Sequence, residues 1–323
     1  MTRPVVALVS EDSDLNLYLV TQVLQHRRVP YLWIDPVVED RNFDFRFAVS
    51  DHRGNCAGEM IDARGEVLPL GSIRSVWSRG ASYFGGLTTR PGTSANLVHY
   101  ESIYAYEYLW WMLRDRVWVN PILGNRVFCN RLVQTQIAVQ CGMDVPRQMV
   151  ATRGQDVLAF AHDGRRIIKG ISQGGYRETG PRQIKTEYFR DDGPGLDGRL
   201  AAPVLLQEYI EKDHELRVVV VGESVYAAAI DSAKNEATAL DSRLWNQVGL
   251  TYYRVKLADA EREALVDINR RLGLVYSSVD LVRGLDGKLY FLEVNPAGQW
   301  SFIEMLTGFP ITERIVEALL EEA

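Results

Sequence analysis

The chain has 323 residues, of which 46% are hydrophobic and 24% charged, a composition typical of a soluble enzyme with two or three domains and a sizeable core. Its formal net charge of −6 excludes general attraction to nucleic acid or to an anionic membrane, so a polyanion must be bound locally. No apolar run reaches the roughly 18 residues of a membrane span, and the apolar stretch near the N-terminus is too short for a signal peptide. We therefore expect a cytoplasmic protein without membrane or nucleic-acid partners.

The first third of the chain predicts an open α/β sheet. A buried strand (4–10), a capped helix (12–28) and a second strand (30–35) form a βαβ opening. The first turn lacks Gly-x-Gly-x-x-Gly, which argues against a dinucleotide-binding domain. Another strand is predicted over 72–80. A long aromatic-rich helix follows over 94–115, and its Tyr and Trp residues are favoured as packing residues rather than catalytic ones.

The segment "VNPILGN" (119–125) has the Asn-Pro and Gly-Asn composition of a linker, and it predicts a domain boundary near residue 125. Three domains are expected, with the bounds 1–125, 126–212 and 213–323. The stretch that follows the linker predicts a helix, a Gly stop and a strand.

The rest of the chain alternates predicted strands with two helices. Strands at 165–171 and 203–210 flank a polar, Gly-rich segment, 172–199, which we expect to be mobile. A hairpin is predicted over 214–232. The remaining predicted elements are a helix at 259–273, strands at 275–284 and 287–296 joined by Asp286-Gly287, and a last helix starting at Pro310.

The three cysteines, Cys56, Cys129 and Cys141, favour buried thiols. They are odd in number and have no Cys-x-x-Cys spacing, which argues against a disulfide framework or structural zinc.

Three oxygen-bearing side chains are expected to meet on the last hairpin. Glu293 and Asn295 project from one face of their strand because side chains alternate with period two. Asp280 lies about as far before the turn as Glu293 lies after it, so the hairpin should bring the two carboxylates opposite each other. Two carboxylates and an amide oxygen suit Mg²⁺. The alternative is two solvated edge acids and a turn Asn.

A second group of candidates precedes this hairpin. Lys169 ends an apolar strand and is followed by the loop "GISQGGYRETG", which includes Gly174 and Gly175 and could surround phosphate oxygens with backbone amides. A solvated Lys before a flexible loop is the alternative. In "LLQEYIEKDHELRV", the hinge between two strands could offer backbone N–H and C=O groups to an adenine edge, and Glu215 could accept from ribose hydroxyls. Arg217 shares the strand face of Glu215 and could bind a phosphoryl group, unless the two form only a surface ion pair.

The order of Lys169 with its Gly loop, "QEYI", "ELR", Asp280 and "EVNP" resembles the ATP-grasp superfamily. The whole chain resembles its ribosomal-peptide maturases, the graspetide or microviridin-type synthetases, with "FLEVNPAGQW", "TGFPI", "QEYIEKDHELRVVVVG" and "ALDSR" as the specific stretches. The resemblance implies an α/β (α+β) ATP-grasp fold. It would consist of an N-terminal open α/β pre-ATP-grasp domain, a small central α+β domain and a C-terminal ATP-grasp domain with an antiparallel sheet.

The resemblance also implies roles for single residues. Lys169 and the Gly loop would contact ATP phosphates, the stretch Glu208, Tyr209 and Ile210 would line adenine, and Glu215 would bind ribose. Asp280, Glu293 and Asn295 would hold Mg²⁺, and Arg217 and Arg243 would stabilise the transferred phosphoryl group. Two positions depart from the family pattern. Arg131 stands in the usual place of a Lys, and Ser242 stands in the usual place of a Trp. Arg131 keeps the charge but binds phosphate as a fork.

The implied activity is ATP-dependent macrocyclisation of a ribosomally made precursor peptide, with a leader that docks and a core that is modified. Asp or Glu side chains of the core would form ester or amide cross-links with Ser, Thr or Lys through an acyl phosphate. The alternatives are a RimK-like ligase that adds an amino acid to a carboxylate, and a nucleotide-binding scaffold without turnover. A homodimer is a further expectation from the family.

Four of the basic residues in the segment 172–199 could attract an acidic leader or core, or could simply form a solvated loop. They are Arg177, Arg182, Lys185 and Arg190.

Overall fold

The protein is described here by a computed structural model. The described residues are 5–35, 43–49, 56–62, 65–79, 95–121, 129–171, 186–191, 196–230 and 251–321. Contacts divide the chain into two compact units that do not follow chain order: unit 1 holds residues 1–125, 273–276 and 299–323, and unit 2 holds 126–272 and 277–298. The division into 1–125, 126–212 and 213–323 stays a proposal.

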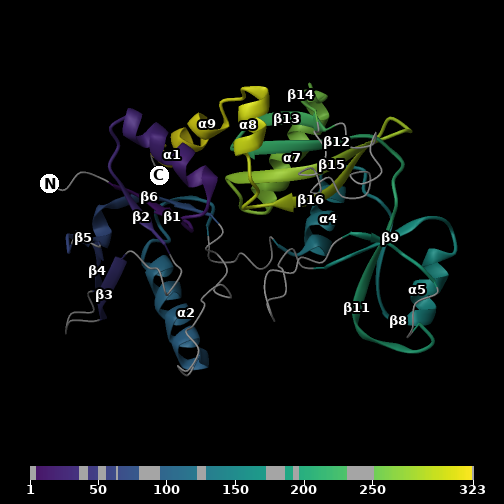
Figure 1. Cartoon of the computed structure of the whole chain (residues 1–323), viewed down its shortest axis with the longest axis horizontal. Coiled ribbons are helices and arrows are strands. Elements are labelled where there is room, and N and C mark those ends of the chain that lie inside the picture. The colour runs from purple at the N-terminus through teal and green to yellow at the C-terminus, as the bar shows by residue number, and fades with distance from the viewer. Residues whose placement is uncertain are drawn as a thin grey trace. The chain divides into compact units, whose positions relative to one another are not determined.

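A parallel sheet forms the centre of unit 1 (Figure 1). Its strand order is β2-β1-β6-β7, and every neighbouring pair is parallel. Helix α1 begins after Asp14, whose side chain accepts a hydrogen bond from the Asn16 N–H as an N-cap. These elements confirm the predicted βαβ opening and the strand after it. The bounds are β1 Val5–Val9, α1 Leu15–His26, β2 Tyr31–Ile34, β6 Ile73–Ser78 and β7 Val117–Val119.

Unit 1 also contains a small antiparallel sheet that the sequence did not reveal. Its order is β3-β4-β5, with β3 Phe43–Val49, β4 Cys56–Asp62 and β5 Val67–Pro69, and the 3-10 helix η1 Leu70–Ser72 follows β5.

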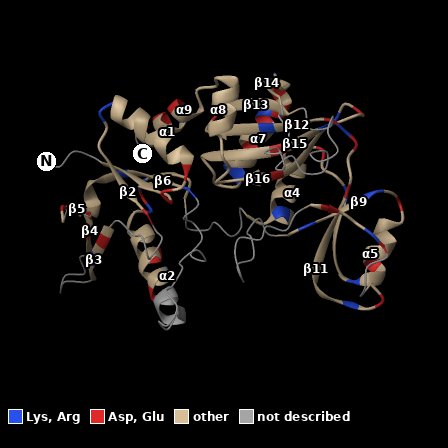
Figure 2. Cartoon of the chain, viewed as in Figure 1, with Lys and Arg blue, Asp and Glu red and all other residues tan. Residues whose placement is uncertain are grey.

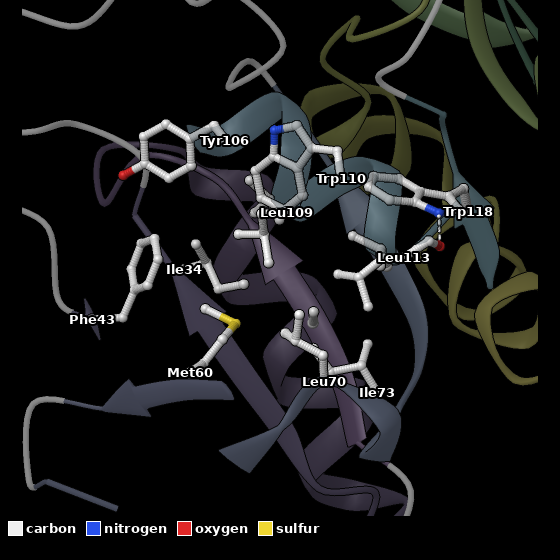
Figure 3. Close-up of a cluster of buried hydrophobic side chains, with 13 residues drawn as sticks. Ile34, Phe43, Met60, Leu70, Ile73, Tyr106, Leu109, Trp110, Leu113 and Trp118 are labelled. Atoms are coloured by element: carbon white, nitrogen blue, oxygen red, sulfur yellow. Dashed lines mark hydrogen bonds between the residues drawn. The ribbon is translucent and has the colours of Figure 1, made fainter. Parts of the chain in front are cut away.

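The aromatic helix α2, Ala95–Met112, contributes to the hydrophobic core of unit 1, where its side chains meet residues of the two sheets such as Ile34 and Met60 (Figure 3). Tyr106, Leu109, Trp110 and Leu113 recur at helical spacing and are all at most 3% exposed. The indole N–H of Trp118 donates to the Leu113 carbonyl at 2.8 Å. For the residues of this stripe, the predicted packing role is confirmed.

Two helices late in the chain belong to unit 1. They are α8 Ser301–Thr307 and α9 Ile311–Leu320. The fully buried Trp300 lies edge-on to Trp77 and to Tyr276, with ring centroids 6.0 and 5.2 Å away. The Asn16 side-chain oxygen accepts from the Trp300 and Ser301 N–H groups, which fixes the start of α8 against α1.

Unit 2 contains a four-stranded antiparallel sheet of order β10-β9-β11-β8. Helix α5 packs on it through Val157, which contributes to an apolar cluster with Ala151 and Leu206. Gly154 permits a close approach, because a Cβ there would lie 1.9 Å from the Leu196 carbonyl oxygen. The bounds are β8 Gln148–Arg153, α5 Gly154–Ala161, β9 Arg166–Lys169, β10 Glu187–Tyr188 and β11 Arg199–Glu208.

A five-stranded sheet of order β14-β13-β12-β15-β16 completes unit 2. Both predicted hairpin turns are confirmed, and Gly222 (φ 56°) and Gly287 (φ 81°) take the left-handed conformation that these turns need. The strands are β12 Lys212–Val221, β13 Ser224–Ile230, β14 Tyr252–Arg254, β15 Tyr276–Gly284 and β16 Leu289–Asn295. The helices are α4 Arg131–Gln140 and α7 Asp259–Arg271.

None of the helices in the described part of the chain has the length and apolar character that a membrane crossing requires.

Candidate active site

The β15–β16 hairpin brings the two predicted carboxylates together. Asp280 pairs with Glu293, and Ser278 pairs with Asn295. Opposite residues in an antiparallel ladder project from the same face, so Asp280, Glu293 and Asn295 share one side of the sheet.

A β-bulge in β16 adds an apolar side chain to this face. The register passes from Asp280 opposite Glu293 to Leu281 opposite Phe291, which leaves Leu292 without an opposite residue. Adjacent residues on a regular strand point to opposite faces, whereas a bulge re-aims one of them. Leu292 and Glu293 accordingly both line the same cleft.

Each carboxylate is bonded to a guanidinium group from a neighbouring element. Arg217 Nη1 on β12 donates to Asp280 Oδ1 at 2.5 Å, and Arg131 Nε at the start of α4 donates to Glu293 Oε2 at 2.5 Å. Arg131 also donates through Nη1 to the Gly170 carbonyl, directly after β9. The fork of Arg131 therefore connects β16 to the strand that ends in Lys169, which a single ammonium group could not do in the same way.

The environment raises the pKa of Asp280. Removal of the carboxylate from water is the main cause, and the negative charge of Glu293 adds to it, while the Arg217 guanidinium acts in the opposite direction. A site that disfavours this negative charge favours a bound cation, because a cation offsets the repulsion between the two carboxylates.

A cleft of unit 2 opens beside these carboxylates. The space inside it, including the open mouth, is about 880 Å³. Its lining includes five apolar side chains, namely Pro146, Ile167, Ile210, Val282 and Leu292. It also includes seven charged side chains, namely Arg131, Lys169, Glu208, Lys212, Glu215, Asp280 and Glu293. A lining with both apolar and charged side chains suits a ligand with a flat base and phosphates.

Lys212 belongs to this cleft and was missed in the sequence. Its ammonium donates to Glu215 Oε1, and the two side chains are only 7% and 14% exposed. Glu215, expected to bind ribose, thus has a basic partner within the cleft. Only the proximity of Lys212 to Glu215 in "EKDHE" could have indicated it, since that spacing also occurs in ordinary surface pairs.

The stretch between β11 and β12 lines the cleft with its main chain. The N–H groups of Glu208 and Tyr209 donate to the carbonyls of Arg147 and Arg165 at 2.8 and 3.1 Å. The Ile210 N–H takes part in neither of these two bonds. The Glu208 carboxylate accepts from Arg147, so the side chain of Glu208 has a structural partner of its own.

Asn295 differs from the other two expected ligands. Its side-chain oxygen accepts from the Ala297 N–H at 3.1 Å, and Asn295 is not among the residues that line the cleft. Within the described ranges, no three His, Cys, Asp or Glu residues gather as a metal-binding group. Mg²⁺ is usually bound by one or two carboxylates together with substrate phosphates, so the facing pair of Asp280 and Glu293 still fits this ion.

Lys and Arg residues are interspersed with Asp and Glu residues along the chain of unit 2 (Figure 2). Several predicted residues lie outside the described part of the chain: Gly174, Gly175, Arg177, Arg182, Lys185, Ser242 and Arg243. Arg190 is described and is exposed.

The RimK-like ATP-grasp domain family matches residues 192–319. This part of the chain is similar to the RimK-like ATP-grasp domain. The matched residues include Glu208, Glu215, Arg217 and the whole β15–β16 hairpin, so the site described above lies largely within the matched region.

Solved ATP-grasp ligases share the fold over nearly the whole chain. A RiPP-associated ATP-grasp ligase of Chryseobacterium gregarium, in complex with ADP and a leader and core peptide, has a TM-score of 0.85 at 20% identity and covers 99% of this chain and 97% of its own. The macrocyclase MdnC of Microcystis aeruginosa MRC, bound with precursor peptide MdnA, has a TM-score of 0.81 at 23% identity, and the match covers 98% of this chain and 100% of MdnC. The ligase PsnB, complexed with minimal precursor, Mg and ADP, has a TM-score of 0.72 at 18% identity, and the match covers 99% of this chain and 98% of PsnB. The predicted ATP-grasp fold is confirmed.

Curated relatives match a shorter part of the chain. Two proteins named "Probable alpha-L-glutamate ligase 1", from Shewanella sp. (strain ANA-3) and Shewanella oneidensis, are each 38% identical over 120 residues. The match covers 36% of this chain and 38% of each relative, so the chain spans less than two fifths of their length. The names of these relatives and of the solved structures agree with the predicted class of ATP-grasp ligase.

Proposed function

We propose that the protein is an ATP-dependent ligase that joins Asp or Glu side chains of a ribosomal precursor peptide to Ser, Thr or Lys side chains of the same peptide. The observation that carries the proposal is the facing pair of Asp280 and Glu293, each bonded to an Arg, beside a cleft lined by apolar and charged side chains. The fold shared with peptide-bound ATP-grasp ligases along nearly the whole chain supports a peptide as the substrate.

The apolar and charged side chains that line the cleft suggest how ATP would bind. The base would lie between Ile167, Val282 and Leu292, with the main chain of residues 208–210 at its polar edge. Glu215 would accept hydrogen bonds from the ribose hydroxyls, and these bonds would replace part of its interaction with Lys212. Lys169 and Lys212 would offset phosphate charge, since each places an ammonium group in the cleft. The glycines Gly174 and Gly175 stay proposed phosphate contacts.

Asp280 and Glu293 would hold Mg²⁺, with Asn295 as the proposed third oxygen ligand. A bound Mg²⁺ supplies charge neutralisation at the β- and γ-phosphates. Binding would also change the local pairing, because Arg217 and Arg131 now occupy oxygens of the two carboxylates. Arg217 would share Asp280 with the cation and would bind the transferred phosphoryl group, and Arg243 stays a proposed partner in that role.

The chemistry needs activation because a carboxylate is a poor electrophile. A carboxylate oxygen of the peptide would attack the γ-phosphorus of ATP, the bond to the β-phosphate oxygen would break, and an acyl phosphate and ADP would result. A Ser or Thr hydroxyl or a Lys amine would then attack the acyl carbon, lose its proton and release phosphate. The peptide loses one water for each ester or amide formed, and one ATP becomes ADP and phosphate.

Four basic residues between positions 177 and 190 would offer a route to an acidic peptide despite the net negative charge. Arg190, together with Arg177, Arg182 and Lys185, is proposed to attract the leader or core. Changing these four residues to Glu should weaken precursor binding, with the difference shrinking at high salt. Equal binding by the variant at low salt would remove this part of the proposal.

Mass spectrometry of a candidate precursor tests the main proposal. An acidic, Ser/Thr-rich peptide encoded beside this protein is incubated with enzyme, ATP and Mg²⁺. The expected product has lost one water mass for each cross-link, and ADP accumulates in proportion. ADP release without a mass change would argue for hydrolysis rather than ligation. Neither ADP nor a product with any plausible precursor would favour a binding scaffold.

A RimK-like ligase is the second candidate, favoured by the domain match and by the identity to named glutamate ligases. The same assay separates the two functions when free glutamate is added. Transfer of an amino acid to a carboxylate raises the peptide mass by one residue, whereas cross-linking lowers it.

A further inference from the structure

A buried glutamine joins helix α4 to the strand that carries the proposed metal ligands. Gln134 is 0% exposed. Its side-chain Nε2 donates to the Val294 carbonyl at 2.8 Å, and its Oε1 accepts from the Val294 N–H at 3.0 Å. One side-chain amide therefore satisfies both polar groups of a single strand residue, and that residue lies between Glu293 and Asn295.

The location of Val294 explains why this pairing matters. β16 is the last strand of its sheet, so the peptide groups on its outer side have no neighbouring strand. The bulge at Leu292 interrupts the regular ladder directly before Glu293. The Phe291 N–H on one side of the bulge donates to the Asp144 carbonyl at 2.9 Å, and Gln134 supplies the corresponding bonds on the other side.

The same helix also contacts Glu293 itself. Arg131 and Gln134 lie three residues apart on α4, a spacing that places both on one helix face. Arg131 bonds the carboxylate of Glu293, while Gln134 bonds the main chain of the next residue. The first turn of α4 thus fixes both the side chain and the backbone of the strand segment from 293 to 295.

We propose that Gln134 is a positioning residue for Mg²⁺-dependent nucleotide binding, acting through the backbone of Val294 on Glu293 and Asn295. The inference rests on the proposed ATP-dependent function. Gln134 touches neither nucleotide nor metal in this scheme. It limits the movement of the bulged strand end, so that the two ligand side chains keep the spacing that one cation requires. Outer partners that orient metal ligands commonly change metal affinity roughly 10–100-fold when they are removed.

A matched control exists on the opposite face of the same sheet. Asn269 on α7 is 2% exposed, and its side-chain oxygen accepts from the Ser277 hydroxyl on β15 at 2.6 Å. Ser277 and Asp280 are an odd number of positions apart, so their side chains project from opposite faces. Asn269→Leu removes a buried polar contact of unit 2 without touching the strand segment that holds Glu293 and Asn295.

The experiment measures binding of a fluorescent ATP analogue to the full chain, first in EDTA and then across a Mg²⁺ titration. Gln134→Met, which keeps the side-chain length but cannot pair with Val294, is compared with wild type and with Asn269→Leu. We expect Gln134→Met to raise the half-saturating Mg²⁺ concentration roughly 10–100-fold. Its binding of the analogue in EDTA should stay as in wild type. Asn269→Leu should lower the melting temperature but leave the Mg²⁺ titration unchanged.

Each remaining outcome has a definite meaning. An unchanged Mg²⁺ titration in Gln134→Met, or an equal shift in both variants, overturns the positioning role. If Gln134→Met does not fold, Gln134→Asn, whose shorter amide cannot reach both groups of Val294, is judged by the same comparison. Failure of both variants to fold also counts against the proposal, because Gln134 would then serve the fold as a whole. Wild type that binds no analogue, or binds it without Mg²⁺ dependence, contradicts the proposed function instead.

Discussion

Arg131→Lys should make local opening of strand β16 easier, although the substitution keeps the positive charge. Arg131 makes two bonds in different directions, one to the Glu293 carboxylate and one to the Gly170 carbonyl. A hydrogen bond to a charged group contributes about 1.5–3 kcal/mol, and a lysine would keep only the bond to Glu293. The free energy of local opening of β16 should therefore fall by about 1.5–3 kcal/mol. Arg131→Met removes both bonds and leaves Glu293 without this partner, so its loss should be larger, about 3–5 kcal/mol.

Hydrogen exchange followed by mass spectrometry measures this opening in the peptide that contains residues 289–295. Exchange there should speed up in Arg131→Lys and more so in Arg131→Met, while peptides from β1 in unit 1 should exchange as in wild type. The side chains of Arg131 and Glu293 are only 16% and 21% exposed, so added salt should change these differences little. Wild-type exchange in Arg131→Lys would refute the reasoning, because the bond to Gly170 would then contribute nothing.

Three further predictions concern other parts of the chain. Gly298→Ala should lower both the melting temperature and kcat, because a Cβ there would lie 2.3 Å from the Ser278 Cβ and 2.9 Å from Arg217 Nη2, so that β15 and that guanidinium would both have to shift; kcat and the melting temperature, measured together, check this. Cys141, whose pKa is raised to about 11 by burial and by its bond to Asp267, should react slowly with iodoacetamide at neutral pH and faster as the pH approaches that value. Asp267→Asn should lower this pKa and speed the reaction at a fixed mildly alkaline pH, as peptide mass spectrometry would show; an unchanged rate would contradict the assignment. Trp300→Ala should reduce the unfolding free energy by about 3–5 kcal/mol in urea, since the ring is fully buried, and a small change would mean that the site collapses around the gap.

The carboxylate pair was predictable because its causes are local. An Asp-Gly turn fixes the register of the strands on either side of it, and register then decides which side chains face each other. Asp280 and Glu293 follow from this rule without knowledge of the rest of the fold. The helical stripe of α2 was predictable for a similar reason, since periodicity along one element determines which residues it buries.

Other features of the site depend on contacts between segments far apart in the sequence. The bulge at Leu292 has no turn residue or glycine to mark it, and the contacts of Arg131 and Gln134 with β16 join residues about 160 positions apart. The sheet β3-β4-β5 was missed although β3 alternates apolar with charged residues over its first five positions, the pattern of a strand with one buried face. The signal in the other two strands is weaker, because β4 does not alternate regularly and β5 has only three residues. Lys212 was missed because burial, not residue type, distinguishes it from a surface lysine.

The return of residues 299–323 to unit 1 has a consequence for synthesis on the ribosome. Helix α9 contacts α1, β6 and β7, and the Arg74 guanidinium donates to the Leu320 carbonyl at 2.7 Å. Well over two hundred residues lie between β6 and α9 in the sequence. Because ribosomes add about 5–20 residues per second, α9 is synthesised roughly 10–50 s after β6. During this time the nascent parallel sheet lacks its α9 cover, so the emerging chain presents apolar surface that a chaperone can recognise.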